Sequence, residues 1–240
     1  MKPVIIVPAR LGSTRLPRKP LADINGKPMV VHCMNKCIEA NIAPVYVATD
    51  SDEIAAVVKA AGGQVIMTDP ALPSGTDRAY AAFQQIKGDF DTVINVQGDQ
   101  PILYPENITA LIPALEGADI STPVAHMPDN RDFEKSSVVK AVVALGNKAL
   151  WFTRGQTPFA WEGQPNDYYQ HIGIYAYKVP ALQRFVSLPP SPLELRERLE
   201  QLRALENGMT IKVAIVSADK IPHAVDTQED LDRARRLIKN

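Results

Sequence analysis

The amino-acid sequence predicts a three-layer α/β/α domain with a mixed sheet and a smaller antiparallel insertion in its second half. Short runs rich in valine and isoleucine alternate with amphipathic helical stretches along most of the chain, which is typical of parallel sheets with crossover helices. The chain of 240 residues is long enough to bury a large core without disulfides or metals. Because no linker or repeat interrupts it, we expect one domain over residues 1–240.

Repeated strand and helix units make up the first half. We expect strands at 4–7, 45–48, 64–68 and 92–96, and helices at 29–40, 50–62 and 76–86. Pro28 suits a first helical turn, where its missing N–H has no helical partner. Asp50 with Glu53 predicts the start of the second helix, and Thr76 is the candidate cap of the third.

The second half is less regular. We expect strands at 120–124, 138–145, 172–177 and 211–216, helices at 105–115, 192–207 and 227–238, and a loop over 126–135. Ser191 and Glu194 form a capping box around Pro192, and Gly208 ends the helix that they begin. The alternation of 172–177 predicts a half-exposed strand.

Composition excludes several classes of protein. With 26 basic and 27 acidic side chains, the chain lacks the basic surface that binds nucleic acid. No stretch approaches the roughly 18 apolar residues of a membrane span, and the apolar run at 4–7 is too short for a signal peptide. Cys33 and Cys37 fit neither a redox pair nor a zinc set, so we expect them to pack as small hydrophobic residues. We therefore expect a cytoplasmic protein without nucleic-acid or membrane partners.

A basic segment follows the first strand. Lys2, Arg10, Arg15, Arg18 and Lys19 all precede the first acidic residue, and open α/β sheets bind ligands where such strands end. The small residues Ala9, Gly12 and Ser13 allow backbone amides to approach an anion, while the cations suit phosphate oxygens. A solvated basic loop is the alternative. Neither a Walker loop nor a dinucleotide glycine fingerprint is present.

Two carboxylates are candidate metal ligands. Asp99 follows the strand at 92–96 and a glycine, and Mg²⁺ is usually bound by one or two carboxylates plus substrate phosphates. A turn or cap aspartate is the alternative for Asp99. The best second ligand is Asp226, which from spacing alone serves equally well as a cap for the last helix.

A set of motifs in a fixed order resembles one family. They are Pro8-Ala9-Arg10, Ser13 to Pro17, Lys19-Pro20-Leu21, Asp23 to Met29, Ala48-Thr49-Asp50, Ser74 to Arg78, Asn95 to Asp99, His171 to Tyr175, Ser191 to Glu194, Glu200 to Arg203 and Val225-Asp226-Thr227. This sequence resembles the 3-deoxy-D-manno-octulosonate (Kdo) cytidylyltransferases, or CMP-Kdo synthetases, over essentially its whole length. The resemblance implies a Rossmann-like fold of the nucleotide-diphospho-sugar transferase type, with sugar-binding and dimerisation elements in the second half.

The resemblance also implies an activity. A protein of this family couples CTP to Kdo, which gives CMP-Kdo and pyrophosphate for lipopolysaccharide biosynthesis, with Mg²⁺ as cofactor and a homodimer as assembly. CMP activation of a related acid, 8-amino-Kdo or a nonulosonic acid, is the alternative. A non-catalytic nucleotide sensor is a rival from another class, disfavoured by the two carboxylates.

Residue roles follow from the same resemblance. Arg10, Lys19, Asp99 and Asp226 are expected to be catalytic, the two aspartates as Mg²⁺ ligands. The nucleotide site is expected to comprise Pro8, Ala9, Arg10, Ser13, Arg15, Lys19, Ser74, Gly75, Thr76 and Arg78, with 74–78 near cytosine. The sugar acid is expected to contact Gln97, Arg154, His171, Tyr175, Glu200 and Gln201. Arg154 suits a carboxylate by bidentate pairing.

Four of the sugar-side residues also have a structural alternative. Arg154 is otherwise a surface arginine, His171 a core or edge histidine, and Glu200 and Gln201 part of a solvated helix face. The sequence departs from the family pattern at Gln100, Arg18 and Gly155-Gln156, where glutamate, glycine and an Ala-Pro pair are usual. The last change adjoins Arg154, so it bears on the choice of sugar.

Overall fold

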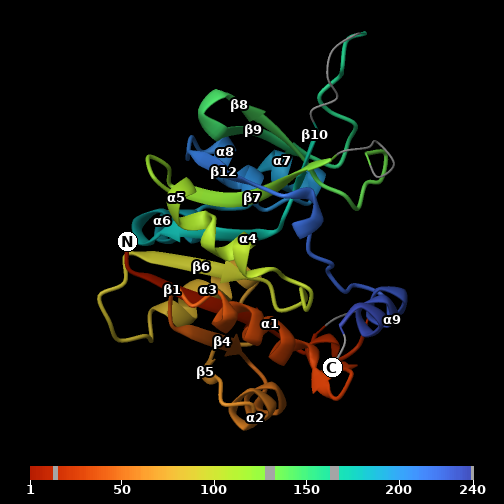
Figure 1. The fold of residues 1–240 in the computed structure, drawn as a ribbon. Helices are drawn as coiled ribbons and strands as arrows, with labels where there is room; N and C mark the ends of the chain where they lie inside the picture. The colour runs from red at the N-terminus through yellow and green to blue at the C-terminus, as the bar shows by residue number, and fades with distance from the viewer. Residues whose placement is uncertain (13–15, 128–132, 163–167, 239–240) are drawn as a thin grey trace. The chain divides into compact units, whose positions relative to one another are not determined.

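A computed structural model of the chain describes residues 1–12, 16–127, 133–162 and 168–238 (Figure 1). The chain divides into two compact units, Met1–Thr109 with Pro222–Asn240, and Ala110–Ile221. The expectation of one domain over residues 1–240 stays a prediction beside this division.

The first unit contains the predicted strand and helix units. Its elements are β1 (Pro3–Ala9), η1 (Lys19–Leu21), β2 (Asp23–Ile24), β3 (Lys27–Pro28), α1 (Met29–Glu39), β4 (Val45–Thr49), α2 (Asp52–Ala60), β5 (Gln64–Met67), α3 (Gly75–Phe83), β6 (Thr92–Val96), α4 (Pro105–Thr109) and α9 (Gln228–Leu237). The predicted strands at 4–7, 45–48, 64–68 and 92–96 are confirmed. The short pair of β2 and β3 was not predicted.

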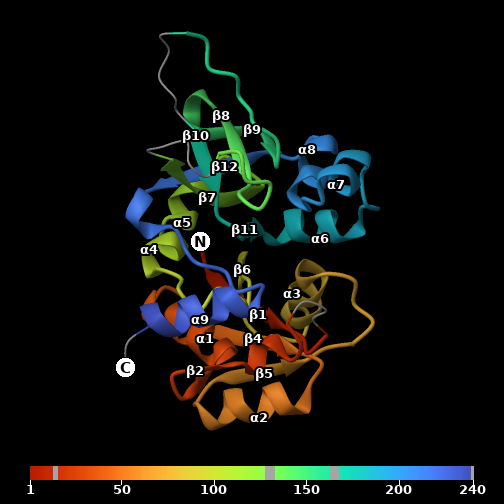
Figure 2. The same cartoon turned by 90° about the vertical axis from the view of Figure 1, so that its right-hand side faces the viewer.

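The strands of the first unit run in the order β6-β1-β4-β5 and all pair in parallel. β1 and β6 are buried almost throughout, as apolar strands covered on both faces are. The chain moves from β1 to β4 and β5 in one direction and then returns to β6 on the other side of β1. With right-handed crossovers, α1 and α2 cover one face and α3 the other (Figure 2). The order therefore reverses at β1, which is where such sheets bind ligands.

The second unit contains α5 (Leu111–Ala114), β7 (Ile120–Met127), β8 (Lys140–Ala144), η3 (Leu145–Asn147), β9 (Lys148–Thr153), β10 (Tyr168–His171), β11 (Ile174–Lys178), α6 (Val179–Ser187), α7 (Pro192–Glu197), α8 (Gln201–Glu206), β12 (Ile211–Val216) and η4 (Ala218–Lys220). β12 pairs in parallel with β7. β8 pairs antiparallel with β9 and β10, and β10 and β11 pair antiparallel with β7. The predicted mixed sheet with an antiparallel portion is confirmed.

Two predicted helix caps are wrong by one or two residues. Ser51, not Asp50, caps α2, because its side chain accepts a hydrogen bond from Ile54 N. Ser74, not Thr76, caps α3 and accepts bonds from the backbone N–H groups of the first turn. Asp50 is consequently left with its carboxylate available for another partner.

Other differences lie in the connections. The expected helix at 105–115 is two short helices, α4 and α5, and the one at 192–207 breaks between α7 and α8 at Arg198, which has a φ of 53°. The expected strand at 172–177 corresponds to β11, and the prediction that it is half-exposed is wrong, because every residue of β11 except Lys178 is buried. β9, β10 and α6 were not predicted, and part of the expected loop at 126–135 lies outside the described residues.

The cysteine prediction is confirmed. Cys33 and Cys37 are free and completely buried on one face of α1, and burial raises the pKa of both thiols. In the described part of the chain, no helix combines the length and the apolar character that crossing a membrane requires.

Candidate active site

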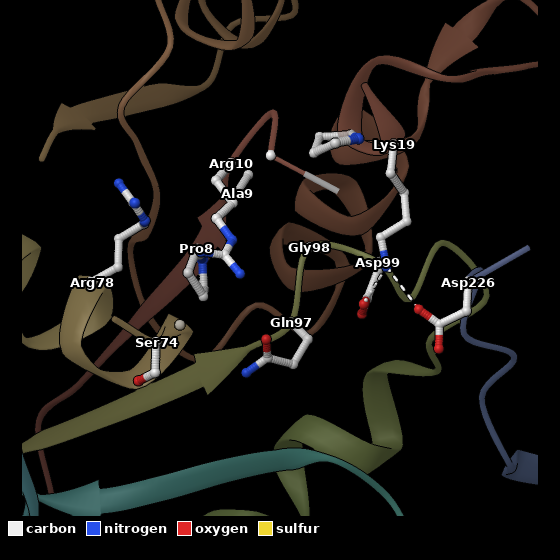
Figure 3. A pocket seen from close by; sticks show the side chains of 13 residues that line it. Pro8, Ala9, Arg10, Lys19, Ser74, Arg78, Gln97, Gly98, Asp99 and Asp226 are labelled. Carbon is white, nitrogen blue, oxygen red and sulfur yellow. Dashed lines mark hydrogen bonds and ion pairs between the residues drawn. The ribbon is translucent and has the colours of Figure 1, made fainter. Parts of the chain in front are cut away.

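A pocket of about 370 Å³ opens where the strand order of the first unit reverses. It is lined by Pro8, Ala9, Arg10, Gly12, Lys19, Pro20, Ser74, Gly75, Arg78, Gln97, Gly98, Asp99 and Asp226. In Figure 3, Lys19 and the two aspartates gather on one side, Ser74 and Arg78 lie on the opposite side, and Arg10 lies between them. The pocket thus joins the basic segment and both predicted metal ligands in one place.

The two central strands position most of these residues. β1 ends at Ala9 and delivers Arg10 to the pocket, while the neighbouring β6 ends at Val96 and delivers Gln97 and Asp99. A Cβ atom on Gly98 would lie 2.8 Å from the carbonyl oxygen of Pro8. Only glycine therefore allows the segment after β6 to approach the end of β1 this closely.

A backbone hydrogen bond brings the segment that contains Asp226 next to Asp99. Val225 N donates to the carbonyl oxygen of Asp99 at 2.9 Å, next to an isolated bridge between Ile102 and His223. Helix α9 is capped by Thr227, which forms a capping box with Asp230: Asp230 N donates to Thr227 Oγ1, and Thr227 N donates to Asp230 Oδ2. The capping alternative for the carboxylate of Asp226 is therefore wrong, and this carboxylate faces the pocket (Figure 3).

Lys19 lies between the two aspartates. Its ammonium donates to Asp99 Oδ2 at 2.8 Å and to Asp226 Oδ1 at 3.0 Å. Burial disfavours the charged form of Lys19, but the two carboxylates outweigh burial and raise the pKa of the ammonium. One cation thus holds together two carboxylates from distant parts of the chain.

At the opposite side of the pocket, the first turn of α3 supplies Ser74, Gly75 and Arg78. The Ser74 hydroxyl caps the helix and donates to Asp77 Oδ2 at 2.6 Å. The amide of Gln97 packs against Gly75, where a Cβ atom would lie 3.2 Å from Gln97 Oε1. Thr76 is buried, accepts a bond from Asn95 Nδ2 and is not among the lining residues.

The structure brings together most of the predicted nucleotide residues. Pro8, Ala9, Arg10, Lys19, Ser74, Gly75 and Arg78 line the pocket, whereas Ser13 and Arg15 lie outside the described residues. Pro20 and Gly98 also line it and were not among the predicted contacts. Gly98 has a readable signal, since a glycine between a buried strand and a polar residue often marks a close backbone approach.

The remaining predicted sugar contacts belong to the second unit. Arg154 there donates from Nε to Glu197 O at 2.8 Å and from Nη1 to Ser136 O at 2.8 Å. Its backbone N–H donates to Glu197 Oε2 at 2.9 Å. Backbone carbonyls therefore fix the orientation of this guanidinium, whereas the guanidinium of an ordinary surface arginine is free to rotate.

His171, at the end of β10, and Tyr175, in β11, lie side by side. Their ring centroids are 5.5 Å apart, and His171 Nε2 is 2.9 Å from Thr122 Oγ1. Burial lowers the pKa of His171 to about 3, and burial, aided by Glu200, raises the pKa of Tyr175. Both side chains are thus neutral over the physiological pH range.

Glu200 and Gln201 begin helix α8. Glu200 Oε1 lies 3.7 Å from Arg203 Nη2. Gln201 is only 5% exposed, and its Nε2 has no hydrogen-bond partner among the described residues. The alternative of a solvated helix face is therefore wrong for Gln201.

The neutral, buried His171 predicts acid sensitivity. An unfolded chain takes up a proton near pH 6.5 that the folded chain refuses until about pH 3, so the unfolded state binds more protons between these values. Stability due to this group is complete above pH 6.5 and falls by up to about 1.4 kcal/mol per pH unit on acidification. Urea unfolding of the unmodified chain and of His171→Gln at several pH values measures this pH dependence of stability. The difference in unfolding free energy between the two should narrow as the pH falls from 7 to 4.5, and a constant difference would contradict the shift.

Fold and site together define a class of protein. A basic segment and paired carboxylates meet at the switch point of a parallel sheet, as in an α/β enzyme that acts on nucleotides. A family model described as "Cytidylyltransferase" matches residues 4–211. The 3-deoxy-manno-octulosonate cytidylyltransferase of Paramagnetospirillum magneticum is 46% identical, over 100% of this chain and 98% of that protein.

Further relatives agree. The enzyme of the same name from Rhodopseudomonas palustris (strain BisB18) is 49% identical over 99% of this chain and 98% of its own length. A solved structure of CMP:2-keto-3-deoxy-manno-octonic acid synthetase complexed with CTP matches with a TM-score of 0.91 and 37% identity, over 99% of this chain and 98% of that one. The chain belongs to the 3-deoxy-manno-octulosonate cytidylyltransferase family.

Proposed function

We propose that this chain transfers the cytidylyl group of CTP to Kdo, forming CMP-Kdo and pyrophosphate. The observation that carries the proposal is the pocket that unites Arg10 and Lys19 with Asp99 and Asp226. A triphosphate needs cations for its oxygens, and nucleotidyl transfer depends mainly on positioning and charge stabilisation. The names of the relatives at 46% and 49% identity support the same substrates.

The chain's own residues would act on the phosphates. The anomeric hydroxyl of the sugar acid attacks the α-phosphorus in line, an oxygen–phosphorus bond forms, the bond to pyrophosphate breaks, and the hydroxyl proton passes to solvent. Arg10 would offset the charge of the departing pyrophosphate. Lys19 would provide a second cation when the bound triphosphate competes with the two carboxylates for its ammonium group.

We propose Mg²⁺ as the cofactor, held by Asp99 and Asp226. The donor set fits: two carboxylates already converge on the ammonium of Lys19, and one or two carboxylates plus substrate phosphates are the usual Mg²⁺ ligands in proteins. No group of three or more histidine, cysteine or acidic side chains suited to a metal occurs in the described residues, so substrate oxygens would complete the shell. When bound, Mg²⁺ supplies charge stabilisation on the phosphates.

The proposed reaction has a direct test. Purified protein mixed with CTP, Mg²⁺ and Kdo should release pyrophosphate, and release should require all three. A panel of 8-amino-Kdo and nonulosonic acids separates Kdo from the alternative sugars. Faster release with one of those acids would replace the sugar in the proposal. Absence of release with every acid would reject the activity.

The family resemblance supports three finer proposals. We propose a homodimer, lipopolysaccharide biosynthesis as the use of the product, and the cytoplasm, where CTP is made, as the place of action. The buried, free thiols of Cys33 and Cys37 are compatible with a reducing compartment.

A further inference from the structure

Arg78 is an almost completely buried cation in the wall of the pocket. It lies in the first turn of α3, its side chain is 2% exposed, and it lines the side of the pocket that lies opposite the two aspartates (Figure 3). A guanidinium buried to this extent requires a charge partner and acceptors for its N–H groups. The identity of those partners decides what Arg78 offers to a ligand.

The partners come from the ends of two neighbouring strands. Arg78 Nη2 donates to Asp50 Oδ2 at 2.9 Å, and Nη1 donates to Thr68 Oγ1 at 2.5 Å. Asp50 directly follows β4 and Thr68 directly follows β5, and Thr68 N donates to Thr49 O at 2.8 Å. The guanidinium is therefore fixed to the rigid carboxyl ends of the sheet.

In the described chain, Asp50 neither caps a helix nor forms a second ion pair. Ser51 caps α2, and Asp52 and Glu53 place acidic groups in its first turn. The carboxylate of Asp50 makes its one ion pair among the described residues with Arg78, at 2.9 Å, and is largely covered itself. Helix capping therefore does not account for an aspartate at position 50, whereas the ion pair with Arg78 does.

This pairing makes Arg78 differ in its chemistry from Arg10, the other arginine that lines the pocket. Arg78 keeps N–H donors beyond the two it uses, because a guanidinium has five, but Asp50 offsets its charge. Arg10, in contrast, forms no ion pair within the described residues and retains its charge. A phosphate group prefers the uncompensated cation. An arginine whose charge is offset attracts phosphate less, but it still offers fixed donors to the acceptor atoms of a neutral base.

We propose that Asp50 is a positioning residue for base selection. It fixes the guanidinium of Arg78 and offsets its charge, so that the remaining N–H groups of Arg78 donate to the acceptor atoms of a cytosine base. This inference rests on the proposed function, since it takes the nucleotide to be CTP. Cytosine presents acceptors at O2 and N3, whereas uracil carries a hydrogen at N3 and would face a fixed donor with another donor. A site built to hydrogen-bond one such edge rejects the other strongly.

The test compares CTP and UTP binding in the absence of sugar. Isothermal titration of the full chain gives the ratio of the two dissociation constants, and Asp50→Asn should lower the preference for CTP by at least about tenfold, equal to about 1.4 kcal/mol. Thr68→Val removes the second acceptor and should lower the same ratio by a smaller factor. Inorganic triphosphate should compete better against CTP in Asp50→Asn, because the charge of Arg78 is then uncompensated.

A matched control comes from the second unit. Glu194 forms a similarly buried ion pair with Arg203, at 2.5 Å, so Glu194→Gln should lower the thermal transition and leave the CTP to UTP ratio unchanged. An unchanged ratio in both Asp50→Asn and Thr68→Val would overturn the inference, as would an equal loss of selectivity in Glu194→Gln. Because the titrations contain no sugar, their outcome is separate from pyrophosphate release by the unmodified chain, which tests the proposed function.

Discussion

Replacing Asp99 with asparagine should lower turnover of CTP and Kdo by at least about 100-fold while the thermal unfolding transition stays almost the same. Asparagine keeps the shape of the side chain but removes the charge that pairs with Lys19 and that the proposed Mg²⁺ would need. Stability should change little, because the side chain of Asp99 is one-third exposed and Lys19 retains its bond to Asp226. The effect therefore separates a role in the reaction from a role in the fold.

Steady-state rates measured over a range of Mg²⁺ concentrations check this expectation. If Asp99 is a ligand, Asp99→Asn should also need more Mg²⁺ to reach half of its own maximal rate. The matched control is Asp89→Asn, which breaks the exposed ion pair with Lys2 and should leave both quantities unchanged. Near-normal turnover of Asp99→Asn, with an unaltered Mg²⁺ requirement, would reject the metal assignment.

The strands of the first unit were predictable because burial on both faces selects continuous apolar runs. β1 and β6 have this character and were placed within one or two residues. The capping box of α7 was predictable for a different reason, since its two side chains satisfy backbone groups only three residues apart. In both cases the signal is contained in a short segment of chain.

The elements that were missed depend on contacts that a short segment does not contain. β10 begins after residues outside the described range and pairs with both β7 and β8, which are distant in sequence. Arg198 interrupts the charged helix with a left-handed conformation that no glycine announces. α6 is the exception, because Pro180 at its first turn and its buried Ala181, Leu182 and Phe185 carry a helical signal.

For the site, the sequence supplied the groups but not their pairing. Asp99 and Asp226 are candidate metal ligands by type and position, yet the capping alternative for Asp226 was decided only by Thr227 and by the backbone bond from Val225 to Asp99. Likewise, Asp50 has the features of a cap residue, and only the fold brings it to Arg78. Long-range partners decide between local alternatives that propensity leaves equal.

Substituting alanine for Gly98 should disturb both stability and turnover, because this glycine sets the distance between the two central strand ends. An added Cβ atom would lie 2.8 Å from Pro8 O, 3.5 Å from Ala9 Cβ and 3.6 Å from Val7 Cγ1. A backbone oxygen cannot rotate away as a side chain can, so the segment after β6 must move away from β1. Asp99 would move with it, relative to Arg10 and Lys19.

We expect Gly98→Ala to lose about 1–3 kcal/mol of unfolding free energy and about 100-fold in turnover, the effect of a displacement near 1 Å at a reacting centre. Urea unfolding and the pyrophosphate assay measure the two losses. Gly12→Ala is the control for stability alone, since a Cβ atom there meets nothing within 4 Å and should leave the unfolding free energy almost unchanged. Should Gly98→Ala keep both the stability and the turnover of the unmodified chain, the approach of the strand ends would not be what places Asp99. We expect the loss of turnover even where the loss of stability is small, because the fold tolerates a small shift of this segment more readily than the positioning of a carboxylate against a phosphate does.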